Sequence, residues 1–154
     1  MFRKNSFTGL ILDLIFKIVT FGFSAYLSFW LWIIISISLD SNNGESAKNL
    51  AGSLPVFVLW ITVAVLCVVG FVFTCLSFPL TKNEEKYESK KKIFYTNIII
   101  DVLLLLVLVS VAIFSVIKGD FQIYLFVLPC LFVVPLILYI VDMARHKKTN
   151  QQKQ

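Results

Sequence analysis

The chain alternates between long uncharged apolar stretches and short polar connections. The apolar stretches cover 18–39, a part of 49–81, 93–117 with one interruption, and 121–141. An α-helix needs about 20 apolar residues to cross the hydrocarbon core of a bilayer, whereas a strand of a membrane barrel needs only about 9–11 residues. The pattern therefore predicts an all-α integral membrane bundle of four transmembrane helices, arranged as two hairpins in a single domain over 1–154.

The helix bounds follow from charges and prolines at the ends of the stretches. Pro55 and Pro79 flank the second helix, because proline is tolerated in the first turn of a helix and stops a helix at its end. The predicted helices are 8–39 with a membrane part of 18–39, 55–78, 93–117 and 121–142, with a cytoplasmic loop at 79–92 and a cytoplasmic tail at 143–154.

The segment 5–17 precedes the first uncharged stretch and mixes apolar residues with Asp13 and Lys17. Such a segment either lies along the membrane interface or extends the first helix, and we expect the extension. The two charges also argue against a cleavable signal peptide, since they interrupt the early apolar stretch and no small-residue cleavage site follows closely.

Lysine and arginine concentrate before the first helix, between the second and third, and after the fourth. The two opposite connections contain only Lys48 and Lys118. Because cytoplasmic segments of membrane proteins carry an excess of lysine and arginine, both termini are predicted to be cytoplasmic. The abundance of Ile, Phe, Lys and Asn is typical of AT-rich genomes, which favours a bacterial cell membrane.

Aromatic residues near the helix ends are expected to form belts at the two membrane interfaces. The residues in these positions are Trp30, Trp32, Trp60 and Tyr124 toward the outer side, with Tyr95 and Tyr139 toward the inner side.

Composition and charge indicate which kinds of partner the chain is expected to bind. The chain is 58% hydrophobic with a formal net charge of +5, which excludes an ordinary soluble domain of this length. The positive charge flanks apolar stretches and forms no basic face interleaved with aromatics, so nucleic acid is not an expected partner. Anionic lipid headgroups fit better. The expected partners are the lipid bilayer and either another membrane protein or a second copy of the chain.

Asp101 interrupts the third apolar stretch. Ionisable residues within a membrane usually face a bundle interior or a water-filled cavity. At 1.5 Å per residue, Asp101 and Lys17 lie at similar depths near the inner boundary of the hydrocarbon core. Asn97 stands one turn before Asp101, and Asp13 one turn before Lys17. These four residues, Asp13, Lys17, Asn97 and Asp101, are the candidate intramembrane polar cluster.

Two interpretations of this cluster remain open. In the structural one, Lys17 pairs with Asp101 and joins the first helix to the third. In the functional one, Asp101 titrates at a proton or cation site that Lys17 tunes. We favour the structural interpretation, because a transported ion usually needs several ligands near the membrane midplane.

Pro129 and Pro135 lie inside the fourth helix and each removes a backbone hydrogen bond. They predict a kink or local unwinding that shapes the helix. In the second helix, Gly70 and Thr74 have the small-xxx-small spacing that permits close helix approach.

No enzyme signature can be assembled from the sequence, and no cofactor or metal is expected. The single histidine, His146, lies in the basic tail, away from any nucleophile or paired carboxylates. The cysteines Cys67, Cys75 and Cys130 lie in apolar stretches without zinc-ligand spacing. The sequence therefore favours a non-enzymatic accessory or interaction protein, including an immunity-type protein, of the cell membrane. The alternative is a small transporter or pore subunit that uses Asp101 and a kinked fourth helix.

Overall fold

The structure is a computed structural model of the 154-residue chain. It describes the backbone of residues 4–40, 44–82, 84–117 and 123–151. Within these ranges, side chains are described for 5–39, 48, 51–82, 90–117, 123 and 125–145.

Four long α-helices and one short 3-10 helix make up the described part of the chain, which contains no β-strand. The elements are α1 (Lys4–Asp40), α2 (Gly44–Ser77), the 3-10 helix η1 (Phe78–Thr81), α3 (Glu84–Ile117) and α4 (Tyr124–Gln151). Each α-helix contributes a stretch long and apolar enough to cross a bilayer, and the second stretch runs from α2 into η1. The four stretches are Asn5–Leu39, Ala51–Thr81, Lys90–Ile117 and Leu125–Arg145. The predicted all-α membrane fold is confirmed.

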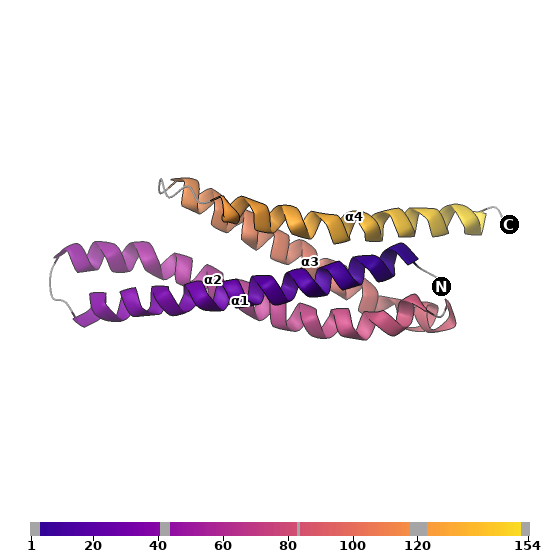
Figure 1. Cartoon of the computed structure of the whole chain (residues 1–154), viewed down its shortest axis with the longest axis horizontal. Helices are drawn as coiled ribbons and strands as arrows, with labels where there is room; N and C mark the ends of the chain where they lie inside the picture. Colours follow the sequence, from indigo (N-terminus) through magenta and orange to yellow (C-terminus); the bar gives the residue numbers. More distant parts are fainter. Residues whose placement is uncertain (1–3, 41–43, 83, 118–122, 152–154) are drawn as a thin grey trace.

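The helices run up and down as two successive hairpins (Figure 1). In this bundle α1 packs against α2 and α4, and α3 also packs against α2 and α4. Helices α1 and α3 are therefore diagonal neighbours. The first and last helices bring the two chain ends to the same end of the bundle, where the connection between α2 and α3 also lies (Figure 1). We call this the terminal end.

Several helices extend beyond the ranges expected from the sequence. Helix α2 begins at Gly44 and contains Pro55, because a membrane helix can continue through a proline. Its other end agrees with a proline stop, since α2 ends at Ser77 and Pro79 lies in the first turn of η1. Helix α1 is continuous from Lys4, so the segment 5–17 extends the first helix.

The expected loop 79–92 and tail 143–154 are largely helical. The loop contains η1 and the beginning of α3, with a backbone irregularity at Lys90 (φ −123°, ψ 22°) that separates the first turns of α3 from its apolar part. Helix α4 continues to Gln151. Residue 83, residues 118–122 at the expected start of the fourth helix, and residues 152–154 lie outside the described residues.

Helix α4 also continues through Pro129 and Pro135, both of which are buried. The expected local unwinding is therefore absent from the described helix. Neither proline is part of the polar cluster described below.

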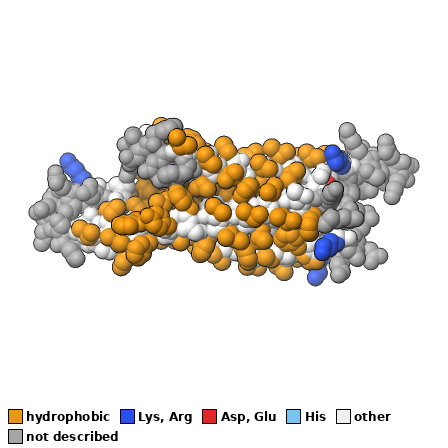
Figure 2. Space-filling view, viewed as in Figure 1, with side chains coloured by type: hydrophobic (Ala, Val, Ile, Leu, Met, Phe, Trp, Pro, Cys, Tyr) orange, Lys and Arg blue, Asp and Glu red, His pale blue; other side chains and the backbone are white. Residues whose placement is uncertain are grey.

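The surface is the reverse of a soluble protein's surface. Apolar side chains cover the visible face between the two ends, and the visible lysine and arginine side chains lie at the ends (Figure 2). Large apolar residues such as Ile18, Val65 and Leu106 are more than half exposed. Charged residues such as Asp13 and Lys17 are instead buried. The chain is a small polytopic membrane protein, because only a lipid environment accommodates such a surface.

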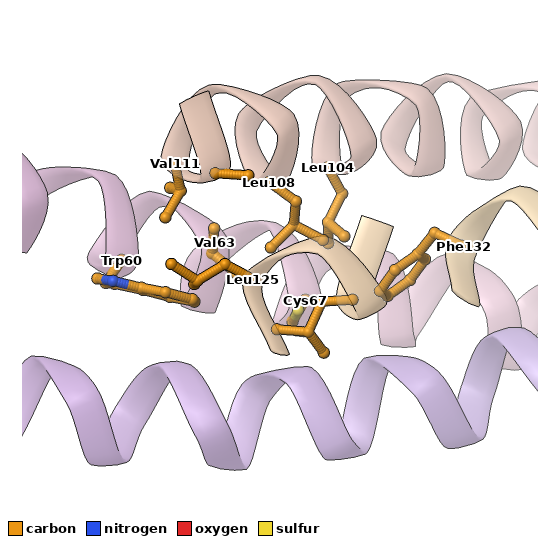
Figure 3. Packing of buried hydrophobic residues seen from close by; sticks show 10 residues of the cluster. Trp60, Val63, Cys67, Leu104, Leu108, Val111, Leu125 and Phe132 are labelled. Carbon is orange, nitrogen blue, oxygen red and sulfur yellow. The ribbon is translucent and has the colours of Figure 1, made fainter. Parts of the chain in front are cut away.

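Two apolar layers fill the interior. The larger layer draws on α2, α3 and α4 (Figure 3), and its members are Trp60, Val63, Cys67, Leu104, Leu108, Val111, Ala112, Leu125, Leu128 and Phe132. The smaller layer lies toward the terminal end and contains Leu10, Leu80, Phe94, Leu136 and Tyr139. On α2 and α3, the buried polar residues Thr74, Asn97 and Asp101 fall between the residues of these two layers.

Candidate functional site

The ammonium group of Lys17 is at the centre of the buried polar cluster. Its Nζ lies 2.7 Å from Asp13 Oδ2 on the same helix and 2.6 Å from Asp101 Oδ1 on α3. All three side chains are at most 1% exposed. Since α1 and α3 are diagonal neighbours, the Lys17–Asp101 ion pair crosses the middle of the bundle. The ion pair expected from the sequence is present.

Neutral oxygen atoms complete the surroundings of the ammonium group. Lys17 Nζ donates to Thr74 Oγ1 at 2.7 Å and to Asn97 Oδ1 at 3.1 Å, and the Gly70 carbonyl oxygen lies 3.5 Å away. Five oxygen atoms from α1, α2 and α3 thus face one nitrogen. Such surroundings offset much of the cost of removing a charged amine from water.

Asp13 Oδ2 is the acceptor that joins the helices. Besides the bond from Lys17, it accepts hydrogen bonds from Thr74 Oγ1 at 2.7 Å, Asn97 Nδ2 at 3.3 Å and Tyr139 Oη at 3.5 Å. These donors come from all of α1 to α4. One carboxylate oxygen therefore ties every helix of the bundle to the same point.

The second carboxylate has fewer partners. Asp101 Oδ2 accepts from Asn97 Nδ2 at 3.4 Å, and Asp101 Oδ1 faces Lys17 without hydrogen-bond geometry. Asp13 Oδ1 is buried and has no hydrogen-bond partner within the described part of the chain. The two carboxyl groups are thus unequally supported.

Gly70 makes room for the Lys17 side chain. A Cβ atom added at Gly70 would lie 2.7 Å from Lys17 Cε and 3.2 Å from its Nζ. Any other residue at this position would compete with lysine for the space between α1 and α2. The close approach expected from the small-residue spacing is therefore used here to admit a lysine side chain.

Tyr139 and Trp60 correct the expectation of interfacial aromatic belts. Tyr139 is fully buried and packs edge to face on Phe94, with the ring centroids 5.4 Å apart. Trp60 is also buried and packs against Phe23. Helix packing takes both rings away from the lipid because each lies on the inward face of its helix. The Tyr124 side chain lies outside the described residues.

The structure brings together Asp13, Lys17, Asn97 and Asp101, and it adds two residues that sequence reasoning missed. Thr74 was considered only as a small residue, and Tyr139 only as an interfacial ring. Both have polar atoms in an apolar stretch, which was the one available signal. That signal is weak, because threonine and tyrosine are frequent in membrane helices.

A second polar contact closes the terminal end of the bundle. Ser6 donates from its backbone nitrogen (3.2 Å) and its Oγ (2.5 Å) to Asp142 Oδ2. The start of α1 is thereby fastened to the last part of α4. Both residues are buried.

An apolar groove of about 230 Å³ lies beside Lys17 between α1 and α2. It is lined by Lys17, Ile18, Phe21, Cys67, Val68 and Phe71. Four of these apolar residues are exposed to the surroundings of the bundle: Ile18, Phe21, Val68 and Phe71. The groove therefore opens toward lipid, while the polar atoms of the cluster point away from it into the interior.

Within the described residues, no group of three or more His, Cys, Asp or Glu side chains could hold a metal ion. Comparisons of the chain with protein-family models, with curated proteins and with solved structures gave no match.

Proposed function

We propose that this protein is a non-enzymatic accessory or interaction protein of the cell membrane, including the immunity-type role of protecting a host membrane. The observation that carries the proposal is the enclosure of the polar cluster. Asp13, Lys17 and Asp101 face one another and are at most 1% exposed. The molecule thus offers mainly apolar helix faces and charged ends to its surroundings, and these surfaces suit contact with another membrane protein or a second copy.

In this proposal the cluster is a structural lock. The Lys17–Asp101 pair joins helices that are not direct neighbours, and Asp13 Oδ2 collects donors from every helix. Hydrogen-bonded polar groups inside a membrane bundle fix the helices in one arrangement. A fixed arrangement presents the same outer surface to every partner.

Photo-crosslinking in the membrane tests the proposal. A photoreactive residue replaces the exposed Val65, Leu106 or Ile137, and the buried Val63 and Leu104 serve as matched controls. We expect at least one exposed position to give a discrete protein adduct, with the other helix faces and both controls giving none. Adducts with lipid alone at every exposed position, together with a monomeric chain in mild detergent, would contradict an interaction role.

The proposed location is a bacterial cell membrane with both termini in the cytoplasm. The distribution of basic residues supports this orientation, since exposed Lys82, Lys90, Lys91 and Lys92 lie near the connection of α2 to α3, and Arg145 near the end of α4. Lys48 lies near the opposite end, in the first turns of α2. An excess of basic residues marks the cytoplasmic side.

Cysteine labelling on intact cells tests the orientation. The single-cysteine variants Lys48→Cys and Lys82→Cys are made in a background in which the three native cysteines are replaced by alanine. With a membrane-impermeant maleimide, we expect Lys48→Cys to react on intact cells and Lys82→Cys to react only after permeabilisation. The reverse result would invert the proposed topology.

A small transporter or pore subunit is the second candidate. The observation in its favour is the set of five oxygen atoms around Lys17 Nζ, which would also suit a metal cation if lysine moved away. Ion flux into proteoliposomes tests it, with Asp101→Asn compared to Asp142→Asn. Flux that is present but equal in both variants would remove Asp101 from the mechanism.

A further inference from the structure

The charges of the polar cluster do not balance when every group is ionised. Asp13 and Asp101 contribute two carboxylates, and Lys17 contributes one ammonium group. The other described basic side chains, Lys48, Lys82, Lys90, Lys91, Lys92 and Arg145, are exposed. An uncompensated charge in the interior of a membrane bundle is costly, and such a site usually takes up or loses a proton instead.

Hydrogen-bond donors are also in short supply within the cluster. An ammonium group has three N–H donors, yet five oxygen atoms surround Lys17 Nζ. Thr74 has a single hydroxyl hydrogen and three acceptors in reach: Asp13 Oδ2, Asn97 Oδ1 and the Gly70 carbonyl oxygen. Asp13 Oδ1 remains unpartnered among the described residues. An additional proton would supply a donor and convert one carboxylate into a neutral group, whose unpaired oxygen costs much less.

We propose that Asp13 and Asp101 form a proton-binding site that holds one proton between them at neutral pH. With that proton the cluster is electrically neutral, with one carboxylate, one carboxylic acid and one ammonium group. Both carboxyl groups contact the same nitrogen, so a single proton serves the two of them. The site stands independently of the proposed function, since a neutral cluster suits both an interaction protein and a transporter.

The environment assigns the proton mainly to Asp101. Hydrogen bonds donated to a carboxylate favour its ionised form, and Asp13 Oδ2 accepts four of them. Among the described side chains, the partners of Asp101 are Lys17 and Asn97. Asp13 is therefore the better-supported anion.

The groups that face the carboxyl pair come from every helix. Lys17 on α1 and Asn97 on α3 contact both carboxyl groups. Helix α4 contributes the Tyr139 hydroxyl. Helix α2 contributes Thr74 and the buried Cys67, which lines the same groove as Lys17. Lys17 is the one cation in this described set.

Infrared spectroscopy of the whole chain in lipid nanodiscs tests the proposal. Aspartate labelled with ¹³C at its carboxyl carbon separates aspartic acid bands from those of glutamic acid. We expect one protonated-carboxyl band at neutral pH that moves on ¹³C labelling. The band should be lost in Asp101→Asn and in Asp13→Asn, because either change leaves one carboxylate to balance the one ammonium group of Lys17. Asp142→Asn is the matched control and should retain the band.

A third variant changes the charge balance in the opposite direction. Lys17→Met removes the cation, so both carboxyl groups should become neutral and the band should increase about twofold. If any variant fails to fold, the wild-type protein alone still shows whether an aspartic acid is protonated at neutral pH. Absence of a protonated aspartic acid band in the folded wild-type chain, or a band that survives both Asp13→Asn and Asp101→Asn, would overturn the proposal.

Discussion

Lys17 reaches the centre of the bundle across Gly70. A Cβ at Gly70 would lie only 2.7 Å from Lys17 Cε, and the Gly70 carbonyl oxygen lies 3.5 Å from Lys17 Nζ. The end of a lysine side chain can move out of such a clash easily. Moving it, however, takes the ammonium group away from Asp13 and Asp101, so the space at Gly70 controls the ion pairs.

Gly70→Ala should therefore destabilise the bundle by about 1–3 kcal/mol, because it displaces a buried charge from its partners. Gly22→Ala is the control, since no atom of the described residues lies within 4 Å of a Cβ added there. That change should be neutral or slightly stabilising, as alanine is the better helix former. Thermal unfolding in detergent measures both. An equal effect of the two substitutions would mean that Lys17 is not held as described.

A double-mutant cycle measures the diagonal contact between Lys17 on α1 and Asp101 on α3. Lys17→Ala and Asp101→Ala should each destabilise the chain, and the double variant should lose less than the sum of the two. We expect a coupling energy of about 1–3 kcal/mol, because the two side chains contact each other directly. Denaturant-induced unfolding of the purified protein gives the four stabilities. Additive effects would show that the pair contributes nothing to stability.

The fold was predictable because the signal for a membrane helix is long and uniform. Stretches such as 18–39 and 93–117 exceed the thickness of the hydrocarbon core without interruption or with a single one. The helix bounds were less predictable. Pro55 suggested a start, yet α2 begins at Gly44, since a proline inside a membrane helix removes one hydrogen bond without ending the helix.

The polar cluster was predictable where charge and periodicity coincide. Asp13 and Lys17, like Asn97 and Asp101, are four residues apart and so share a helix face. The prediction that Tyr139 lies at the membrane interface was wrong for a different reason. A ring near a helix end suits the interface and the interior equally, and the sequence does not say which face of α4 points inward. Only packing against Phe94 decides this.

The contact between Ser6 and Asp142 should stabilise the terminal end of the bundle. Ser6→Ala removes the bond from Oγ and keeps the bond from the backbone nitrogen. We expect a loss of about 1–2 kcal/mol, because the acceptor is a buried carboxylate. Hydrogen exchange at the start of α1 should become faster. The control is Ser110→Ala, whose exposed hydroxyl donates to the carbonyl of Leu106 within its own helix. Similar exchange in both variants would contradict a fastening role.

When an apolar side chain of this bundle is shortened, the loss of stability should depend on the packing contacts that are removed and not on transfer of the side chain from water. Lipid tails are as apolar as leucine, so an exposed leucine loses little when its methyl groups are replaced by lipid. Leu104 is fully buried in the larger apolar layer, whereas Leu106 is 58% exposed. Leu104→Ala should therefore cost about 1–3 kcal/mol through the cavity it leaves, and Leu106→Ala about 0.5 kcal/mol or less. Unfolding in lipid nanodiscs measures the difference. Equal costs would place Leu104 and Leu106 in equivalent surroundings, against the helix faces described for α3.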